Sequence, residues 1–338
     1  MTIRNKNIDM LKAFAAIGVV IIHTKLFYGV NGVYEFLYYL LQTISRIAVP
    51  IFFFFNGYYF YRRYHKNNNK YYKEFCIKII KIHIIAGLIY KLYLTLENYR
   101  DRGEITFKYF KLNNLLKEFL YSGFYYHLWY LPATLLGITV LIIFIKYKKE
   151  KFVLIISVFL YVFGTIFNQV SSNWNIPIEY SRNGVFFGLV FIVMGYLYEK
   201  NKHIINKRIN IKLIYLLIVA LVLLILERAI VYKFIGEKEN DMYIMLLPLT
   251  YLIINFVMKN NMKEIKFISK LGQNSGGIYL YHVLIMFIGW KILYYIKVEK
   301  DGLFYNVFIL IFSYIGAYFF YICFNKGIQE IKKISLKN

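Results

Sequence analysis

Cysteine and acidic residues are scarce in this 338-residue chain. The two cysteines, Cys76 and Cys323, are too few for a disulfide framework and lack the spacing of metal ligands, so we expect free thiols and no metal site. Asp and Glu number 18 against 42 Lys and Arg, giving a formal net charge of +24. A Gly-rich phosphate loop, an internal repeat and a low-complexity tract are also missing. These absences exclude a disulfide-stabilised domain and leave the positive charge to be explained.

Apolar residues dominate what is present. They make up 59% of the chain, with 20% aromatic residues and a mean hydropathy of +0.48. A helix needs about 20 apolar residues to cross a bilayer, and runs of that length recur along the chain. We therefore predict an all-α polytopic membrane protein forming a single domain over residues 1–338. Ten spans are expected, at 8–29, 37–61, 75–96, 127–145, 152–168, 183–199, 213–230, 243–258, 276–296 and 303–323.

The positive charge follows this topology. With alternate loops assigned to opposite sides, one side, which includes both termini, has more than twice as many Lys and Arg as the other. The bias predicts cytoplasmic termini and a multi-pass protein of a bacterial-type plasma membrane, with no nucleic-acid partner. The basic stretches 62–74 and 146–151 either attract anionic lipid or a phosphorylated ligand, or serve only as stop-transfer anchors. In the outer loop 97–126, leucines at helical spacing predict a short amphipathic interfacial helix.

The first span contains ionisable residues. Asp9, Lys12 and His23 lie in the apolar run 8–29, and the 11-residue step from Lys12 to His23 places both on one helix face, roughly 16 Å apart along the axis. Ionisable groups inside a span usually face a protein interior or a water-filled cavity, so this stripe indicates function. Alternatively, Asp9 and Lys12 only mark the interfacial end of the helix, with Lys12 extending to the headgroups.

A catalytic group is predicted toward the outer side. Counted from the outer ends of their spans, His23 lies about 9 Å deep and Arg46 about 13 Å deep, and sequential helices are usually neighbours. His23 is the candidate general base, Arg46 stabilises developing negative charge, and Glu35 in the loop above is the nearest carboxylate that can orient the imidazole. In the alternative interpretation, helix carbonyls hold Arg46, and Thr24 or Ser45 satisfies His23.

An acceptor-side group is predicted at the same face of the membrane. His127 and Trp129 begin the fourth span, and Arg182 and Asn183 begin the sixth, so all four are candidates to line an outer cavity. The alternative for the aromatic residue is an ordinary place in the interfacial belt.

A donor-binding group is predicted toward the cytoplasm. It combines Asp9 and Lys12 with Asn56, at the inner end of the second span, and His282 in the ninth span. Counted from residue 276, His282 lies about 9 Å from the cytoplasmic boundary. Together with the basic loops, these residues are candidates to hold the phosphates of a cytosolic donor.

Four segments resemble the integral-membrane acyltransferase family 3. IDMLKAFAAIGVVIIH is similar to the family's first helix, whose pattern is Asp, two residues, a basic residue, ten residues and His. SRIAVPIFFFFNGYYF resembles its second helix, HLWYLPATLLG its outer His-Leu-Trp segment, and GIYLYH a late helix of Tyr-x-x-x-His type. The four occur in the family's order, and the expected spans agree with its ten-helix architecture.

The resemblance implies transfer of an acyl group, usually acetyl from cytosolic acetyl-CoA, to a hydroxyl or amine of an extracytoplasmic acceptor, commonly a cell-envelope glycan. The family's essential pair corresponds to Lys12 and His23. Here Lys12 stands where Arg is usual and Asn56 where Ser is customary. Lysine offers a point charge in place of a planar fork.

A second resemblance keeps another function open. SRNGVFFGLVFIVMGYLYEK and HLWYLPATLLG are similar to the membrane half of vancomycin-resistance serine racemases, a branch linked to serine uptake, and the chain lacks the racemase half. The competing hypothesis is a membrane transporter module for a small molecule such as serine, using the same helices without acyl transfer. An enzyme and a carrier are separated by whether coenzyme A is released when the acceptor is supplied.

Overall fold

The computed structural model describes residues 5–104, 110–171, 176–203, 211–236, 240–260, 262–300 and 302–335. Within these ranges every regular element is helical and no strand occurs, which confirms the all-α prediction. The chain divides into two compact units, each built from separate stretches. The first comprises residues 1–48, 209–214 and 252–338, and the second comprises residues 49–208 and 215–251. That all 338 residues act as one domain stays a prediction.

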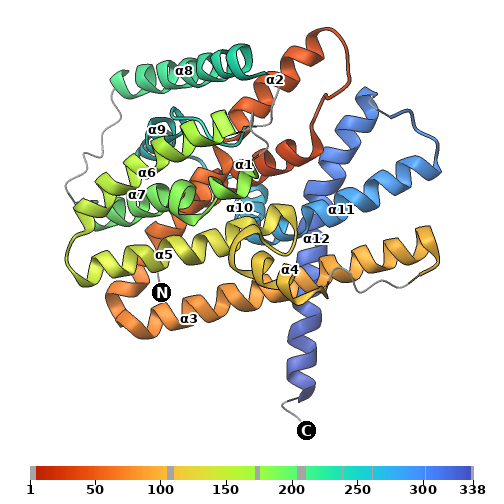
Figure 1. Ribbon diagram of the computed structural model, residues 1–338, viewed down its shortest axis with the longest axis horizontal. Helices are drawn as coiled ribbons and strands as arrows, with labels where there is room; N and C mark the ends of the chain where they lie inside the picture. Colours follow the sequence, from red (N-terminus) through yellow and green to blue (C-terminus); the bar gives the residue numbers. More distant parts are fainter. Residues whose placement is uncertain are drawn as a thin grey trace. The chain divides into compact units, whose positions relative to one another are not determined.

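The first unit is assembled around its N-terminal helix. Helix α1 packs against the other four helices that lie wholly in this unit. Gly18 of α1 faces Ser45 and Ala48, and the hydroxyl of Tyr314 donates to the Ala13 carbonyl at 3.0 Å. These five helices are α1 (Lys6–Thr24), α2 (Val33–Ser45), α10 (Lys266–Gln273), α11 (Ser275–Tyr295) and α12 (Leu303–Ser335) (Figure 1).

Helix α1 ends earlier than its apolar run. Lys25 adopts a left-handed conformation, with φ of 51°, and its N–H donates to the Ile21 carbonyl at 3.1 Å, so the helix stops at Thr24 instead of near residue 29. The next residues leave the helix, and the N–H of Phe27 donates to Asn306 Oδ1 on α12 at 3.0 Å. Hydropathy continues across this turn, which is why the expected boundary was wrong.

The expected span 37–61 is interrupted. Helix α2 ends at Ser45 and α3 (Ala48–Arg102) begins two residues after Arg46. Pro50 explains the break, because its ring clashes with the carbonyl four residues earlier, that of Arg46, and supplies no N–H. The Gln42 amide donates to the Ile21 carbonyl at 3.0 Å, which confirms that α1 and α2 are neighbours.

The second unit contains the middle of the chain. Helices α8 and α9 contribute residues to both units, as does α3 through its first residue, Ala48, and the remaining elements belong to the second. In chain order, the elements after α3 are α4 (Leu112–Lys117), η2 (Glu118–Ser122), η3 (Tyr126–Trp129), α5 (Tyr130–Lys146), α6 (Glu150–Ser171), η5 (Ile178–Tyr180), η6 (Gly184–Gly188), α7 (Leu189–Lys200), α8 (Ile211–Ile235) and α9 (Leu246–Lys259).

Helix α3 reverses direction within its 55 residues. The ring of Phe60 lies 5.5 Å from that of Tyr71 and 5.6 Å from that of Phe75. In a straight helix, residues 15 positions apart are separated by roughly 22 Å, so the chain turns back between them. Figure 1 shows this reversal in orange. The two arms therefore correspond to two expected spans, one ending near residue 61 and the other at 75–96.

Seven helical stretches of the described chain are long and apolar enough to cross a membrane. Three further expected spans are helical but shorter or less apolar: the second arm of α3, η6 with α7, and the 14-residue α9. The amphipathic helix expected near residue 115 is present as α4 and η2, which expose Leu112, Leu116 and Leu120. Both cysteines are free thiols, as expected.

Helices α3 and α7 meet at backbone contact in the second unit. A Cβ atom at Gly57 would collide with the carbonyl of Ile192, and one at Gly195 would collide with that of Phe54. Glycine at both positions therefore lets the two helices approach each other closely. This contact fixes the arm of α3 that carries Asn56.

Candidate functional site

Two histidines from opposite ends of the chain meet in the first unit. His23 lies in the last turn of α1 and is half-buried, whereas His282 lies on α11 and is 0% exposed. Their ring centroids are 5.1 Å apart, with the ring planes inclined at 39°. Two helices thus bring imidazoles to one place inside the protein.

The backbone of α11 determines which nitrogen of His282 carries the proton. Nδ1 lies 2.9 Å from the Tyr279 carbonyl oxygen and 3.1 Å from that of Ile278. A carbonyl oxygen can only accept a hydrogen bond, so Nδ1 is the protonated donor and Nε2 presents the lone pair of the neutral ring.

The structure places His282 beside His23 of α1, and its donor-binding role with Lys12 stays a prediction. A Cβ atom at Gly272 of α10 would lie 3.1 Å from the Ala13 nitrogen and collide with the Asp9 carbonyl, so α10 already covers the N-terminal part of α1. His23 is ten residues beyond Ala13 on the same helix, roughly 15 Å along its axis, whereas His282 lies on α11, beyond the break at Asn274 that separates it from α10.

Arg46 and Glu35 flank His23 at different levels of α2. The contacts between Gly18 and Ser45 and between Ile21 and Gln42 define an antiparallel register. Continuing this register places Arg46 roughly 9 Å from the level of His23 toward the beginning of α1, and Glu35 roughly 8 Å toward the other end. Arg46 is buried, whereas Glu35 is exposed in the first turn of α2. Their roles beside His23 stay predictions.

Lys12 and Asp9 form the polar part of α1 near its N-terminal end. Asp9 is buried and its carboxylate interacts electrostatically with Lys12. The α1 N-terminus is held nearby, where Asn5 accepts hydrogen bonds from the N–H groups of Asn7 and Ile8. Lys12 thus lies on the same helix as His23 but roughly 16 Å away along its axis.

Asn56 belongs to the second unit. Its amide donates to the Tyr130 hydroxyl at 2.7 Å and to Thr134 Oγ1 at 3.2 Å. These contacts join α3 to the beginning of α5, so the side chain of Asn56 is engaged within this unit. These hydrogen bonds do not test the predicted donor-binding role of Asn56.

Two of the predicted acceptor-side residues are in contact with each other. The Arg182 guanidinium lies 5.1 Å from the centroid of the Trp129 ring, a cation–π geometry. Arg182 Nη1 also pairs with Asp241 Oδ2 at 2.5 Å. Sequence reasoning missed Asp241 because the partner comes from a connecting segment 59 residues further along the chain.

The other two predicted acceptor-side residues have structural contacts. His127 is buried, and its ring lies edge-on to Tyr90, with centroids 4.9 Å apart. Asn183 is the N-cap of η6, accepting hydrogen bonds from the N–H groups of Val185 and Phe186. The acceptor-side role of both residues stays a prediction.

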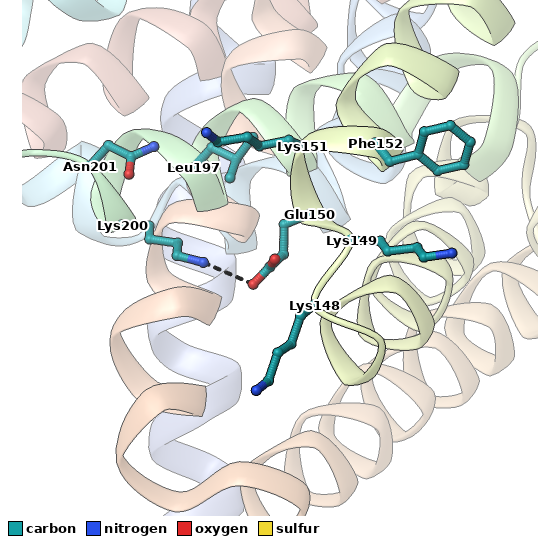
Figure 2. A pocket seen from close by; sticks show the side chains of 8 residues that line it. All are labelled: Lys148, Lys149, Glu150, Lys151, Phe152, Leu197, Lys200 and Asn201. Carbon is teal, nitrogen blue, oxygen red and sulfur yellow. Dashed lines mark hydrogen bonds and ion pairs between the residues drawn. The ribbon is translucent and has the colours of Figure 1, made fainter.

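A basic pocket lies in the second unit, between the turn that joins α5 to α6 and the end of α7. Figure 2 shows its side chains, with the Lys200 ammonium directed at the Glu150 carboxylate, 2.8 Å away. The cavity has a volume of about 360 Å³. The turn is held in place by hydrogen bonds from the N–H groups of Lys148 and Lys149 to the carbonyls of Ile145 and Phe144. Its lining residues are Lys148, Lys149, Glu150, Lys151, Phe152, Leu197, Lys200 and Asn201.

A buried carboxylate near this end of α7 was also missed by sequence reasoning. Glu199 is 3% exposed, and its Oε1 lies 3.3 Å from Arg62 Nε and 2.7 Å from Lys202 Nζ. An acidic residue at the end of a long apolar run can be recognised in the sequence as a candidate buried carboxylate. The partner Arg62 lies 137 residues earlier and cannot be assigned from that signal alone.

Comparison with known proteins gives two kinds of match. An amino-acid racemase of Enterococcus faecalis is 30% identical over 335 residues, covering 93% of this chain and 45% of the racemase. A serine/alanine racemase of Enterococcus gallinarum is 28% identical over 275 residues, covering 76% of this chain and 37% of that protein. The chain thus spans less than half the length of these curated relatives. No solved structure gives a significant match.

The family match covers far more of the chain than any single motif. The model of acyltransferase family 3, described as an acyltransferase domain, matches residues 5–322. The matched range includes His23 and His282 of the first unit. It also includes the Arg182–Asp241 pair and the basic pocket of the second unit. Together with seven membrane-spanning helical stretches, it shows that the protein belongs to acyltransferase family 3 and is a multi-pass membrane protein.

Proposed function

We propose that this protein transfers an acetyl group from cytosolic acetyl-CoA to a hydroxyl, or an amine, of an extracytoplasmic acceptor in a bacterial-type plasma membrane. Family membership supports acyl transfer in general. The finer assignment of donor and acceptor is our inference from the distribution of charge and from the paired imidazoles. A cell-envelope glycan is the acceptor class that we favour.

The observation that carries this proposal is the contact between His23 and His282. A half-buried imidazole beside a second, fully buried one is a site where a proton can be accepted and returned without a metal ion. Both rings can be neutral, so the pair is compatible with its apolar surroundings until a substrate delivers a proton.

The reaction balances with His23 as the general base. His23 takes the proton of the acceptor hydroxyl while the hydroxyl oxygen attacks the thioester carbonyl. The tetrahedral intermediate then collapses, the carbon–sulfur bond breaks, and the thiolate of coenzyme A receives the proton from His23. Arg46 is our candidate for stabilising the oxyanion, since a guanidinium offers fixed hydrogen-bond donors. Glu35 is the more distant candidate for orienting the site.

Two groups of cations are candidates for the phosphates of the donor. Lys12, with Asp9 beside it, is the one suggested by the family pattern. The basic pocket around Lys148 is the other, because it places four lysines and a single carboxylate around one cavity. Phosphates are bound by such groups through charge-assisted hydrogen bonds. Asn56 is kept as a donor-side candidate through its place in the family's second helix.

The acceptor-side proposal centres on Trp129 and Arg182. An aromatic face with a guanidinium stacked on it offers both apolar contact and hydrogen-bond donors to a polar ring such as a sugar. His127 and Asn183 lie beside these residues in sequence and support the same segments. Membrane lipid surrounds the site in this proposal.

The direct test uses the purified full chain in proteoliposomes. Acetyl-CoA and a crude envelope glycan fraction are added separately and together, and free coenzyme A is measured by mass spectrometry. This readout avoids interference from Cys76 and Cys323, which are free thiols. Release only with both substrates supports the proposal. Envelope material from cells with and without the gene should differ by an acetyl-sized mass, and identical spectra together with no release would overturn it.

The same vesicles test the carrier hypothesis. Relatives named for amino-acid racemases make serine the first solute to try. Uptake of labelled serine without acetyl-CoA, and without any release of coenzyme A, favours a transporter module. Release of coenzyme A without uptake of serine favours the enzyme.

A further inference from the structure

We propose that the basic pocket of the second unit is a binding site for a phosphate monoester, which takes Lys200 from Glu150 when it binds. The site goes beyond the proposed function, because it recognises the phosphate group of any molecule that carries one. The acyl donor is one such molecule, but the site does not depend on acyl transfer.

The lining of the pocket is strongly basic. Four lysines and one carboxylate give it a formal charge of +3 around a cavity of about 360 Å³, a size at the small end of ligand pockets. Of the four lysines, only Lys200 has a carboxylate partner within the described ranges. Because like charges repel one another, an anion that enters this cavity relieves the repulsion among the lysines.

The Glu150 carboxylate marks a place for an anion in this pocket (Figure 2). Its Oε1 lies 2.8 Å from Lys200 Nζ. A phosphate oxygen at the place of the carboxylate makes the same charge-assisted hydrogen bond to the Lys200 ammonium. The pocket therefore already contains the kind of contact that a phosphate group needs.

The Glu150–Lys200 pair is exposed enough to exchange partners. The side chain of Glu150 is 16% exposed and that of Lys200 is 38% exposed. One residue earlier, the buried Glu199 binds Arg62 and Lys202 and holds the end of α7. Because exposed ion pairs contribute little to stability, Lys200 can leave Glu150 without loosening the fold.

The charge of the pocket favours a phosphate monoester over a singly charged anion. A monoester carries about −1.5 to −2 near neutral pH, which offsets most of the +3, whereas a phosphodiester offsets only one charge. A singly charged anion also gains little by displacing the carboxylate from Lys200, since it only replaces one negative charge by another. Soluble phosphate esters and lipid headgroups both offer the monoester chemistry, and the stretch 146–151 is on the side predicted to face the cytoplasm.

Phosphorus NMR tests the pocket with the full chain in a maltoside detergent, which contains no phosphorus. Inorganic phosphate represents a soluble source, and phosphatidic acid in the same micelles represents a lipid headgroup that is a monoester. Saturable binding gives a Kd from the ³¹P signal, and the probe that binds identifies the source. The matched diesters, dimethyl phosphate and phosphatidylglycerol, should bind more weakly by about threefold or more. Binding of neither inorganic phosphate nor phosphatidic acid, or equal binding of the diesters, would overturn the proposal.

Two substitutions with opposite effects separate partner exchange from general attraction. Glu150→Gln frees Lys200 and should lower Kd about threefold, and Lys200→Gln should raise Kd about threefold. In the Lys200→Gln background, Glu150→Gln should change Kd by less than about 1.5-fold, because no lysine is left to release. Additive effects, or weaker binding by Glu150→Gln, would contradict the exchange. Glu74→Gln and Lys66→Gln each remove one exposed charge from α3 of the same unit and should leave Kd unchanged.

Melting temperatures check that the variants remain folded. They should stay close to that of the wild-type protein, because the ion pair is partly exposed. Lys148→Gln should also raise Kd, and its exposed side chain has no part in the pair. If acyl transfer is absent while the titrations keep this pattern, the proposed function fails and the phosphate site stands. If acyl transfer occurs while neither monoester binds, the phosphate site fails and the proposed function stands.

Discussion

The two units place ionisable groups inside the protein in different ways. The second unit pairs cations with carboxylates, at N–O distances of 2.5–2.8 Å, in Lys91–Glu118, Arg182–Asp241 and Lys200–Glu150. The first unit instead brings together two imidazoles, one of them wholly buried. Asp9 and Lys12 of the first unit also interact electrostatically, so the contrast lies in the pair of imidazoles.

This difference separates structure from chemistry. A buried ion pair keeps both partners charged, because removing either charge leaves the other uncompensated. Such a pair fixes geometry but cannot exchange a proton easily near neutral pH. A pair of imidazoles can be neutral and can accept one proton between them. We therefore expect loss of His23 to affect mainly the rate and loss of a carboxylate such as Glu118 to affect mainly stability.

His23→Ala tests this expectation most strongly. Loss of the base should reduce kcat by about 10²–10⁴-fold while the melting temperature stays close to wild type, because the side chain is only half-buried. The rate should also fall as pH is lowered through the range in which imidazole is protonated, since a protonated ring cannot accept the proton. Steady-state release of coenzyme A as a function of pH measures both effects.

The control for that experiment is His65→Ala, an exposed histidine on α3. It should retain full activity and the same pH profile. A His23→Ala protein that transfers acetyl groups at the wild-type rate would remove the chemical distinction between the units.

Glu118→Gln probes the second unit. Lys91 is 4% exposed in its side chain and pairs with Glu118 Oε2 at 2.6 Å, so removing the carboxylate leaves a buried cation. Glu118 itself is 27% exposed, which lowers the expected loss to about 2–3 kcal/mol of unfolding free energy, below that of a fully buried pair. Thermal unfolding in detergent measures it. The double variant Lys91→Met/Glu118→Gln should regain most of the stability, and no regain would mean that the pair is not what holds the segment.

Hydropathy predicted the helices well because burial in lipid requires long apolar runs, whatever the partners are. It could not find the end of α1, where Leu26 and Phe27 continue the apolar run through a left-handed turn. The break at Arg46 had a usable signal in Pro50, four residues later, which an apolar count ignores. Helix ends that depend on backbone conformation are thus harder to predict from the sequence than membrane spans, which depend on composition.

The sequence pointed to His23 and His282 separately but did not predict that their rings lie together. His23 and His282 stood out as ionisable groups inside spans, yet the sequence does not give the packing of α1 against α11 that brings their rings together. The partners in the second unit lie outside the predicted spans: Asp241 is in a connecting segment and Glu118 begins η2. To predict which of these residues lie together, one needs the register between helices, which a single sequence does not give.

Lys12 and the basic pocket can be compared through donor affinity. Lys12→Ala should raise KM for acetyl-CoA about tenfold with kcat nearly unchanged, and Lys12→Arg should preserve both, if Lys12 binds phosphate. The triple variant Lys148→Gln/Lys149→Gln/Lys151→Gln should raise KM by a similar factor, and more weakly at high salt, if the pocket does so. Lys111→Gln, an exposed lysine outside the pocket, is the control. A fall in kcat at constant KM would contradict donor binding by either group.

The smallest expected effect concerns the turn that follows α1. Asn306 is 5% exposed, and its Oδ1 accepts the N–H of Phe27 at 3.0 Å, which ties this turn to α12 four residues after His23. Asn306→Ala leaves that N–H without its acceptor and should cost about 1 kcal/mol of unfolding free energy. Because the tie lies close to His23, kcat should also fall by about two- to fivefold, less than for loss of the base itself. Asn31→Ala, an exposed asparagine of the same connection, should change neither quantity, and equal behaviour of the two variants would show that the turn does not help to place the imidazole.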